Sequence, residues 1–139
     1  MNVLIDTSII LDVLLQKEPF FQHSQLVLLA VEAKYINGYV TASTITDVYD
    51  VIKKSVPSKK SAIALLKTLV DTIAIAAVDS DVIINALTTG WDDFEESIKH
   101  SVAESIDADF IVTRNPADFS NGHIKTILPE ALINLIASD

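Results

Sequence analysis

Short apolar runs alternate with helix-length segments along the whole chain, and this alternation constrains the fold more than any other feature. Amphipathic segments separate the expected strands, which are residues 2–5, 39–41, 73–78, 110–113 and 125–127. Strands joined by helical crossovers form a parallel sheet covered on both faces, with right-handed crossovers. We therefore predict an α/β fold of three layers, α/β/α, around a parallel sheet of four to five strands.

Capping residues and helix breakers set the expected helix boundaries. Pro19 follows the first helix, Gly90 ends a later one, and Pro129 stands at the favoured first position of the last. Ser43 or Thr44 is expected to cap the helix that ends near Lys54. The remaining expected helices span about 8–15, 22–33, 79–88 and 92–105, with a further one opening at 58.

The composition fits one globular domain over residues 1–139, because half of the residues are hydrophobic. Cysteine is absent, which excludes disulfides, thiolate zinc sites and cysteine nucleophiles and is typical of a reducing cytoplasm. Residues 1–15 contain Asp6 and Asp12 but no basic residue, unlike a signal peptide. No run reaches the roughly 18 to 20 apolar residues of a membrane span, so we expect a cytoplasmic protein without a membrane role.

The net charge of −9, from 19 acidic and 10 basic residues, argues by itself against nucleic acid as a partner. Acidic residues gathered in a metal site are, however, offset by the ions that they bind. The bases are also uneven, since four lysines crowd into residues 53–60. The simpler interpretation of that cluster is a solvated helix end and loop, and the alternative is a patch that attracts phosphate.

Carboxylates recur where the predicted strands end and the predicted helices begin. Asp6 follows the first strand, Asp47 lies in the first half of a helix, the run 92–96 opens another helix, and Asp118 follows the fourth strand. Open α/β sheets bind ligands at the carboxyl ends of their strands. Grouped carboxylates repel one another without a cation, and they are the ligands of Mg²⁺ and Mn²⁺. Their joint placement indicates a metal-dependent phosphoryl-transfer site.

Each of these residues also has a simpler structural interpretation. Asp6, Asp92 and Asp93 are suitable helix caps. Asp47 is suited to the positive end of a helix dipole, and Asp118 is suited to a turn. The argument for a site therefore depends on the set and not on any single member.

Other chemistries lack the residues that they need. The three histidines show no metal-ligand spacing, and the chain contains neither a glycine-rich phosphate loop nor a G-x-S-x-G motif. An aspartyl-phosphate enzyme would carry a second aspartate two residues after Asp6, where this chain has Ser8.

Motifs spread over nearly the whole chain resemble the PIN domain family of metal-dependent ribonucleases. The most specific is Val112-Thr113-Arg114-Asn115-Pro116-Ala117-Asp118-Phe119, which is similar to the closing strand and turn of the family. The other matching segments are Leu4-Ile5-Asp6-Thr7-Ser8, Asp12-Val13-Leu14-Leu15, Thr44-Ile45-Thr46-Asp47, Asp93-Phe94-Glu95-Glu96-Ser97-Ile98 and Ile127-Leu128-Pro129.

The resemblance implies a nuclease that uses one or two Mg²⁺ or Mn²⁺ ions to cleave single-stranded RNA. It implies an acidic catalytic quartet of Asp6, Asp47, Glu96 and Asp118, with Asp6, Glu96 and Asp118 as metal ligands. It also implies support from Thr7 and Asn115 through hydrogen bonds, with Asp93 as a helper. Two positions depart from the family pattern, because the second acid is usually Glu and the third is usually Asp.

The resulting hypothesis is in-line attack of a metal-activated water on the scissile phosphorus, leaving a 5′-phosphate and a 3′-hydroxyl. Asp6 and Asp118 would anchor the principal cation, Glu96 would complete its shell, and Asp47 would hold a second ion or orient the water. The competing hypothesis is a catalytically impaired PIN fold that binds RNA or protein. A metal phosphohydrolase acting on nucleotides is a third, without a base-binding motif to support it.

The size of the chain resembles the toxin half of bacterial toxin–antitoxin pairs, which implies an antitoxin protein as partner. Apolar helices near 26–33 and 62–69 are compatible with a homodimer interface. The equally good alternative is that these helices only cover the sheet.

Overall fold

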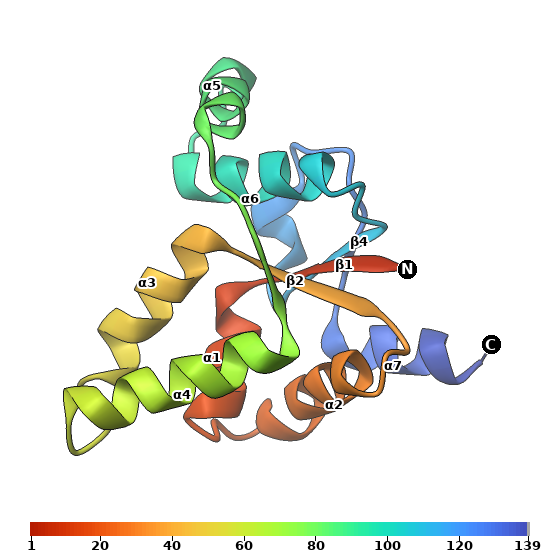
Figure 1. Cartoon of the computed structure of the whole chain (residues 1–139). Coiled ribbons are helices and arrows are strands. Elements are labelled where there is room, and N and C mark those ends of the chain that lie inside the picture. Colours follow the sequence, from red (N-terminus) through yellow and green to blue (C-terminus); the bar gives the residue numbers. More distant parts are fainter. Residues whose placement is uncertain (139) are drawn as a thin grey trace.

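One parallel sheet of five strands forms the centre of the protein, in a computed structural model that describes residues 1–138. The strand order is β3-β2-β1-β4-β5, so the first strand of the chain is the middle strand of the sheet (Figure 1). The strands are β1 (Asn2–Ile5), β2 (Asn37–Thr41), β3 (Ala74–Ala76), β4 (Phe110–Val112) and β5 (Thr126–Ile127). The predicted parallel α/β sheet is confirmed.

Helices cover both faces of this sheet. Helix α6 and the short 3₁₀ helix η1 pack on one face, with α5 packed on α6, and the other five α-helices contribute to the core on the opposite face (Figure 1). The helices are α1 (Thr7–Leu14), α2 (Phe21–Glu32), α3 (Ala42–Ile52), α4 (Lys59–Thr72), α5 (Ser80–Thr89), α6 (Phe94–Ser105), η1 (Pro116–Phe119) and α7 (Pro129–Ala137). None of the helices within residues 1–138 is long and apolar enough to cross a membrane.

Strand β1 is buried on both faces of the sheet. Successive side chains of a strand point to opposite sides, so its residues enter two different cores. Val3 and Ile5 belong to the core beneath α1, α2, α3, α4 and α7, whereas Leu4 belongs to the core beneath α5 and α6. A strand covered on both faces needs apolar residues at every position, which explains the unbroken apolar run at the start of the chain.

The register of β1 and β4 aligns their carboxyl ends. Leu4 pairs with Ile111 and Ile5 with Val112, and the backbone N–H of Asp6 donates to the Val112 carbonyl at 3.0 Å. This pairing makes the first and fourth strands of the chain neighbours in the sheet. It brings Asp6 beside the residues that follow β4.

Most predicted helix ends agree with the structure, and one cap was wrong. Asp79 and Asp93 cap α5 and α6, and Gly90 ends α5 with a φ of 70°. Helix α3, however, is capped by Thr41, whose Oγ1 accepts from the Thr44 N–H at 3.0 Å, and not by Ser43 or Thr44. Strand β2 runs directly into α3 with no connecting loop, so the cap is the last residue of the strand.

Candidate functional site

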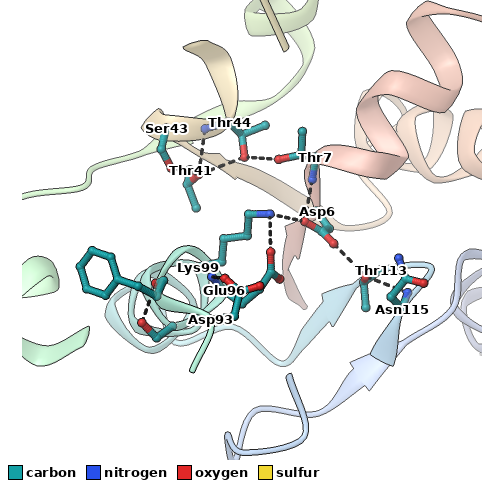
Figure 2. A network of polar contacts seen from close by, with 12 residues as sticks. Asp6, Thr7, Thr41, Ser43, Thr44, Asp93, Glu96, Lys99, Thr113 and Asn115 are labelled. Carbon is teal, nitrogen blue, oxygen red and sulfur yellow. Dashed lines mark hydrogen bonds and ion pairs between the residues drawn. The ribbon is translucent and has the colours of Figure 1, made fainter. Parts of the chain in front are cut away.

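Asp6 lies between the end of β1 and the start of α1, at the carboxyl edge of the sheet. Its backbone is extended, its side chain is buried, and its Oδ1 accepts from the Thr7 N–H at 2.8 Å. Its Oδ2 accepts from the Thr113 hydroxyl, also at 2.8 Å (Figure 2). Asp6 is thus the N-cap of α1, and it also contacts the residue that follows β4.

Lys99 of α6 contacts two of the predicted site carboxylates at once. Its Nζ donates to Asp6 Oδ1 at 2.8 Å and to Glu96 Oε1 at 3.1 Å (Figure 2). The Lys99 side chain is only 12% exposed and the Glu96 side chain 13%. Sequence reasoning missed Lys99, although its spacing of three residues from Glu96 on a helix was a usable signal. We call Asp6, Glu96, Lys99 and Thr113 the Asp6 cluster.

Burial dominates the electrostatics of Glu96 in this cluster. Desolvation raises the pKa of Glu96; the charge of Lys99 opposes this, and the charge of Asp6 adds to it. Burial alone would lower the pKa of Lys99, but Asp6 and then Glu96 outweigh it, so that pKa is raised and the ammonium stays charged. The raised pKa of Glu96 and the raised pKa of Lys99 are compatible. The two carboxylates share one ammonium, and its shorter contact goes to Asp6.

Hydroxyl groups extend the polar network from Asp6 toward α3. The hydroxyls of Thr7 and Thr44 lie 2.9 Å apart, and the Thr41 hydroxyl donates to Thr44 at 3.0 Å (Figure 2). Thr7 therefore contacts Asp6 through its backbone, while its side chain bonds to α3. Asn115 acts one step away, since its backbone N–H donates to the Thr113 hydroxyl at 3.1 Å. The functional roles of Thr7 and Asn115 stay predictions.

The remaining predicted site residues lie outside the Asp6 cluster. Asp47 is exposed on α3, and Asp118 is exposed on η1, where its backbone N–H donates to the Asn115 carbonyl at 3.0 Å. Asp93 caps α6 by accepting from the Glu96 N–H at 3.2 Å. Within residues 1–138, no group of three or more acidic or histidine side chains is close enough to hold a metal ion. The structure brings Asp6 and Glu96 together, and it does not group Asp47 or Asp118 with them.

The donor atoms of the Asp6 cluster nevertheless suit a hard cation. Asp6 Oδ1 and Glu96 Oε1 already converge on one positive group, the Lys99 ammonium. Glu96 Oε2 is buried and finds no hydrogen-bond partner in the part of the chain that the structure describes. A buried carboxylate oxygen without a partner is costly unless a cation or a donor contacts it. Carboxylate oxygens are also the ligand type of Mg²⁺ and Mn²⁺, so the residues fit such an ion.

A second buried aspartate, Asp12 of α1, forms a separate ionic cluster. Its side chain is 0% exposed, and its Oδ2 accepts from the Ser24 hydroxyl at 3.0 Å. Arg114 Nε lies 2.9 Å from the same oxygen, an ion pair whose N–H direction does not meet hydrogen-bond geometry. The Arg114 guanidinium also stacks 3.9 Å from the centre of the Phe20 ring. We call Asp12, Phe20, Ser24 and Arg114 the Asp12 cluster.

The sequence profile of the family described as PIN domain matches residues 2–117, which is most of the chain. The chain belongs to the PIN domain family. PIN domains are generally nucleases, and in this PIN domain the Asp6 cluster lies at the carboxyl edge of the sheet. No curated protein matches the chain in sequence.

Solved structures share the fold of this PIN domain at low sequence identity. A toxin–antitoxin complex from Klebsiella pneumoniae is 21% identical with a TM-score of 0.67, and the match covers 91% of this chain and 97% of that chain. VapBC-1 from nontypeable Haemophilus influenzae is 11% identical with a TM-score of 0.69, covering 94% and 99%. VapC20 from Mycobacterium tuberculosis, a toxin that cleaves the sarcin–ricin loop, is 10% identical with a TM-score of 0.63, covering 78% and 86%.

Proposed function

We propose that this PIN domain is a divalent-metal-dependent endoribonuclease that cleaves single-stranded RNA and acts as the toxin of a toxin–antitoxin pair. The observation that carries the proposal is the convergence of Asp6 and Glu96 on one positive charge at the carboxyl edge of the sheet. Membership of a family of nucleases supports the chemistry, and the toxin–antitoxin complexes that share the fold support the biological role.

Asp6 and Glu96 would hold Mg²⁺ or Mn²⁺, and Asp118, which lies outside the Asp6 cluster, would join them only after a movement of η1 toward the cluster. The bound ion would neutralise charge on the phosphate and make a water molecule more acidic. Thr113 and the Thr7 backbone orient the Asp6 carboxylate through one hydrogen bond to each oxygen. Asp47 on α3 would orient the attacking water, and the products would be a 5′-phosphate and a 3′-hydroxyl.

An antitoxin protein and a second copy of the chain are the proposed protein partners. Helix α2 exposes Leu26 and Leu29, at 43% and 47%, and α4 exposes Ile63 at 42%. Leu26 and Leu29 lie one turn apart on α2 and line the same surface groove, and such neighbouring exposed apolar side chains are typical of surfaces that bind another protein. These side chains lie on the apolar helices that the sequence indicated as a candidate interface.

Cleavage of end-labelled single-stranded RNA by the purified protein tests the nuclease proposal. We expect cleavage in Mn²⁺ that a chelator abolishes. Asp6→Asn should lower the rate at least about 100-fold, the upper end of the losses seen when groups around a bound metal are changed. Asp71→Asn is the matched control, because Asp71 is an exposed acid on α4 and its replacement should leave the rate unchanged. An Asp6→Asn protein that cuts as fast as the parent would refute the assignment.

A second candidate function is favoured by one observation, the position of Lys99 between Asp6 and Glu96. If that ammonium is never displaced, the protein is a PIN fold that binds RNA or an antitoxin without cutting. RNA binding that survives the chelator, together with no cleavage at any Mn²⁺ concentration, would support this alternative over the nuclease.

A further inference from the structure

We propose that Lys99 is a tethered cation that competes with the divalent metal for Asp6 and Glu96 and thereby sets the metal affinity of the site. This inference rests on the proposed metal-dependent function. Helix α6 would then carry both Glu96, which would ligate the metal, and Lys99, which would limit metal binding.

The first step of the argument is that both carboxylates already share one cation. The Lys99 ammonium contacts Asp6 Oδ1 at 2.8 Å and Glu96 Oε1 at 3.1 Å, and all three side chains are largely buried. A divalent ion bound by the same two oxygens would have to replace the ammonium, because two cations in one partly desolvated space repel strongly.

The second step is that Lys99 is able to leave. Its charge is at the end of a flexible four-carbon stem, and a lysine ammonium is a compact, strongly hydrated group. The side chain is 12% exposed, so it is not fully enclosed by the protein. Within residues 1–138, Lys99 does not stack on an aromatic ring, unlike Arg114, whose guanidinium stacks on Phe20.

The third step is that Glu96 has a second carboxylate oxygen available to bind a metal ion. Its Oε2 is buried and has no hydrogen-bond partner within residues 1–138, although its Oε1 is bonded to Lys99. Once the ammonium leaves, Glu96 presents both oxygens and Asp6 presents Oδ1. The charges of Asp6 and Asp93 add to the negative potential at Glu96 and favour a doubly charged ion over a singly charged one.

Mn²⁺ binding measured by calorimetry and by the electron paramagnetic resonance of free Mn²⁺ tests the proposal without RNA. We expect Lys99→Met to bind Mn²⁺ at least about tenfold more tightly than the parent, in the range by which groups around a metal alter its affinity. Lys67→Met removes the same charge from an exposed position on α4, and its Mn²⁺ affinity should equal that of the parent.

Thermal unfolding gives an independent readout. Lys99→Met leaves Asp6 and Glu96 without a cation, so this variant should melt at a lower temperature than the parent in metal-free buffer. Because tighter binding to the folded state stabilises it more, Mn²⁺ should raise the melting temperature of Lys99→Met more than that of the parent. Lys99→Gln, which keeps a polar head group without charge, is the second variant and should respond in the same direction if Lys99→Met does not fold.

The outcomes separate this inference from the proposed function. Equal, measurable Mn²⁺ affinity in the parent and both Lys99 variants would overturn the competition and leave the nuclease proposal standing. Absence of Mn²⁺ binding in all three proteins would overturn both. Tighter binding in the Lys99 variants without any RNA cleavage would support the competition and refute the nuclease.

Discussion

The Asp6 cluster and the Asp12 cluster share three kinds of group, a buried aspartate, a basic side chain and a hydroxyl, and they differ in the type of basic side chain. Each pairs a buried aspartate near the start of the chain with a basic residue from its C-terminal half, and each adds a hydroxyl group. Asp6 is paired with Lys99, a flexible point charge, whereas Asp12 is paired with Arg114, a planar group stacked on Phe20. The first arrangement allows exchange of the cation, and the second fixes it.

The difference indicates that the Asp6 cluster has the proposed functional role and the Asp12 cluster a structural one. Thr113 and Arg114 are consecutive residues after β4, and they contact Asp6 and Asp12 respectively. The Asp12–Arg114 ion pair therefore anchors the segment that presents the Thr113 hydroxyl to the candidate site. Four sets of measurements on variants, taken in order of decreasing expected effect, test this comparison.

Asp12→Asn should have the largest effect on stability. It leaves the Arg114 charge without its buried partner, and breaking a buried ion pair costs about 3 kcal/mol or more. Urea denaturation at neutral pH measures the loss. Asp47→Asn is the control, because Asp47 is exposed on α3 and its replacement should change stability by no more than about 0.5 kcal/mol. Equal values for the two variants would contradict the structural role of Asp12.

Arg114→Lys should cost less, because the positive charge remains. The variant loses the contact of the guanidinium with the Phe20 ring and the planar geometry of the ion pair, together worth about 1 to 2 kcal/mol. Phe20→Leu in the Arg114→Lys background should then add little. A full additional loss in this double-mutant cycle would show that Phe20 and Arg114 act independently.

Removing one hydroxyl from each cluster compares the two directly. Ser24→Ala deletes the donor to Asp12 Oδ2, and Thr113→Val deletes the donor to Asp6 Oδ2. Each should destabilise the protein by about 1 kcal/mol. Thr113→Val should be the more costly, because Thr113 also accepts from the Asn115 N–H. Urea denaturation of both variants in parallel is the test, and the reverse order would contradict the two-bond role of Thr113.

The smallest expected effect is the pH dependence contributed by Glu96. Burial, opposed by Lys99 and reinforced by Asp6, raises the pKa of this carboxyl above 4.5. A carboxyl with a raised pKa in the folded state contributes stability that is complete below its unfolded pKa and is lost as pH rises through the folded pKa. The stability of the parent relative to Glu96→Gln should therefore fall as pH rises from the usual pKa of a glutamate through the raised pKa of Glu96. The exposed Glu95 provides a control, since Glu95→Gln should show no such trend. A difference that grows with pH would mean that the ion pair with Lys99 outweighs burial.

Local sequence patterns were sufficient to predict most of the fold. The apolar run of β1 predicts a strand that is covered on two faces. Helix ends at Asp79, Gly90 and Asp93 are predictable because capping depends on the capping residue and its nearest neighbours in the chain. The sequence placed polar residues at the ends of both β1 and β4, but only the structure shows that the two strands are neighbours and that Asp6 lies beside the residues after β4.

The composition of the two ionic clusters could not be predicted in the same way. A lysine on an amphipathic helix is usually solvated, and Lys99 contacts Asp6 only because α6 is oriented with this face toward the end of β1. The segment Asp12-Val13-Leu14-Leu15 resembled the family without indicating a partner for Asp12, and its partner Arg114 lies far along the chain. The cap of α3 was missed because the last residue of a strand performs it.

The central position of β1 has a consequence for synthesis of the chain. Strand β1 pairs on one side with β4, and the hydrogen bonds of Asp6 to Lys99 and Thr113 span 93 and 107 residues. Contacts between such distant residues form late in folding. A nascent or truncated chain that lacks α6 and the residues after it therefore carries Asp6 without Lys99 and Thr113, and the candidate site forms only once α6, β4 and Thr113 have been synthesised.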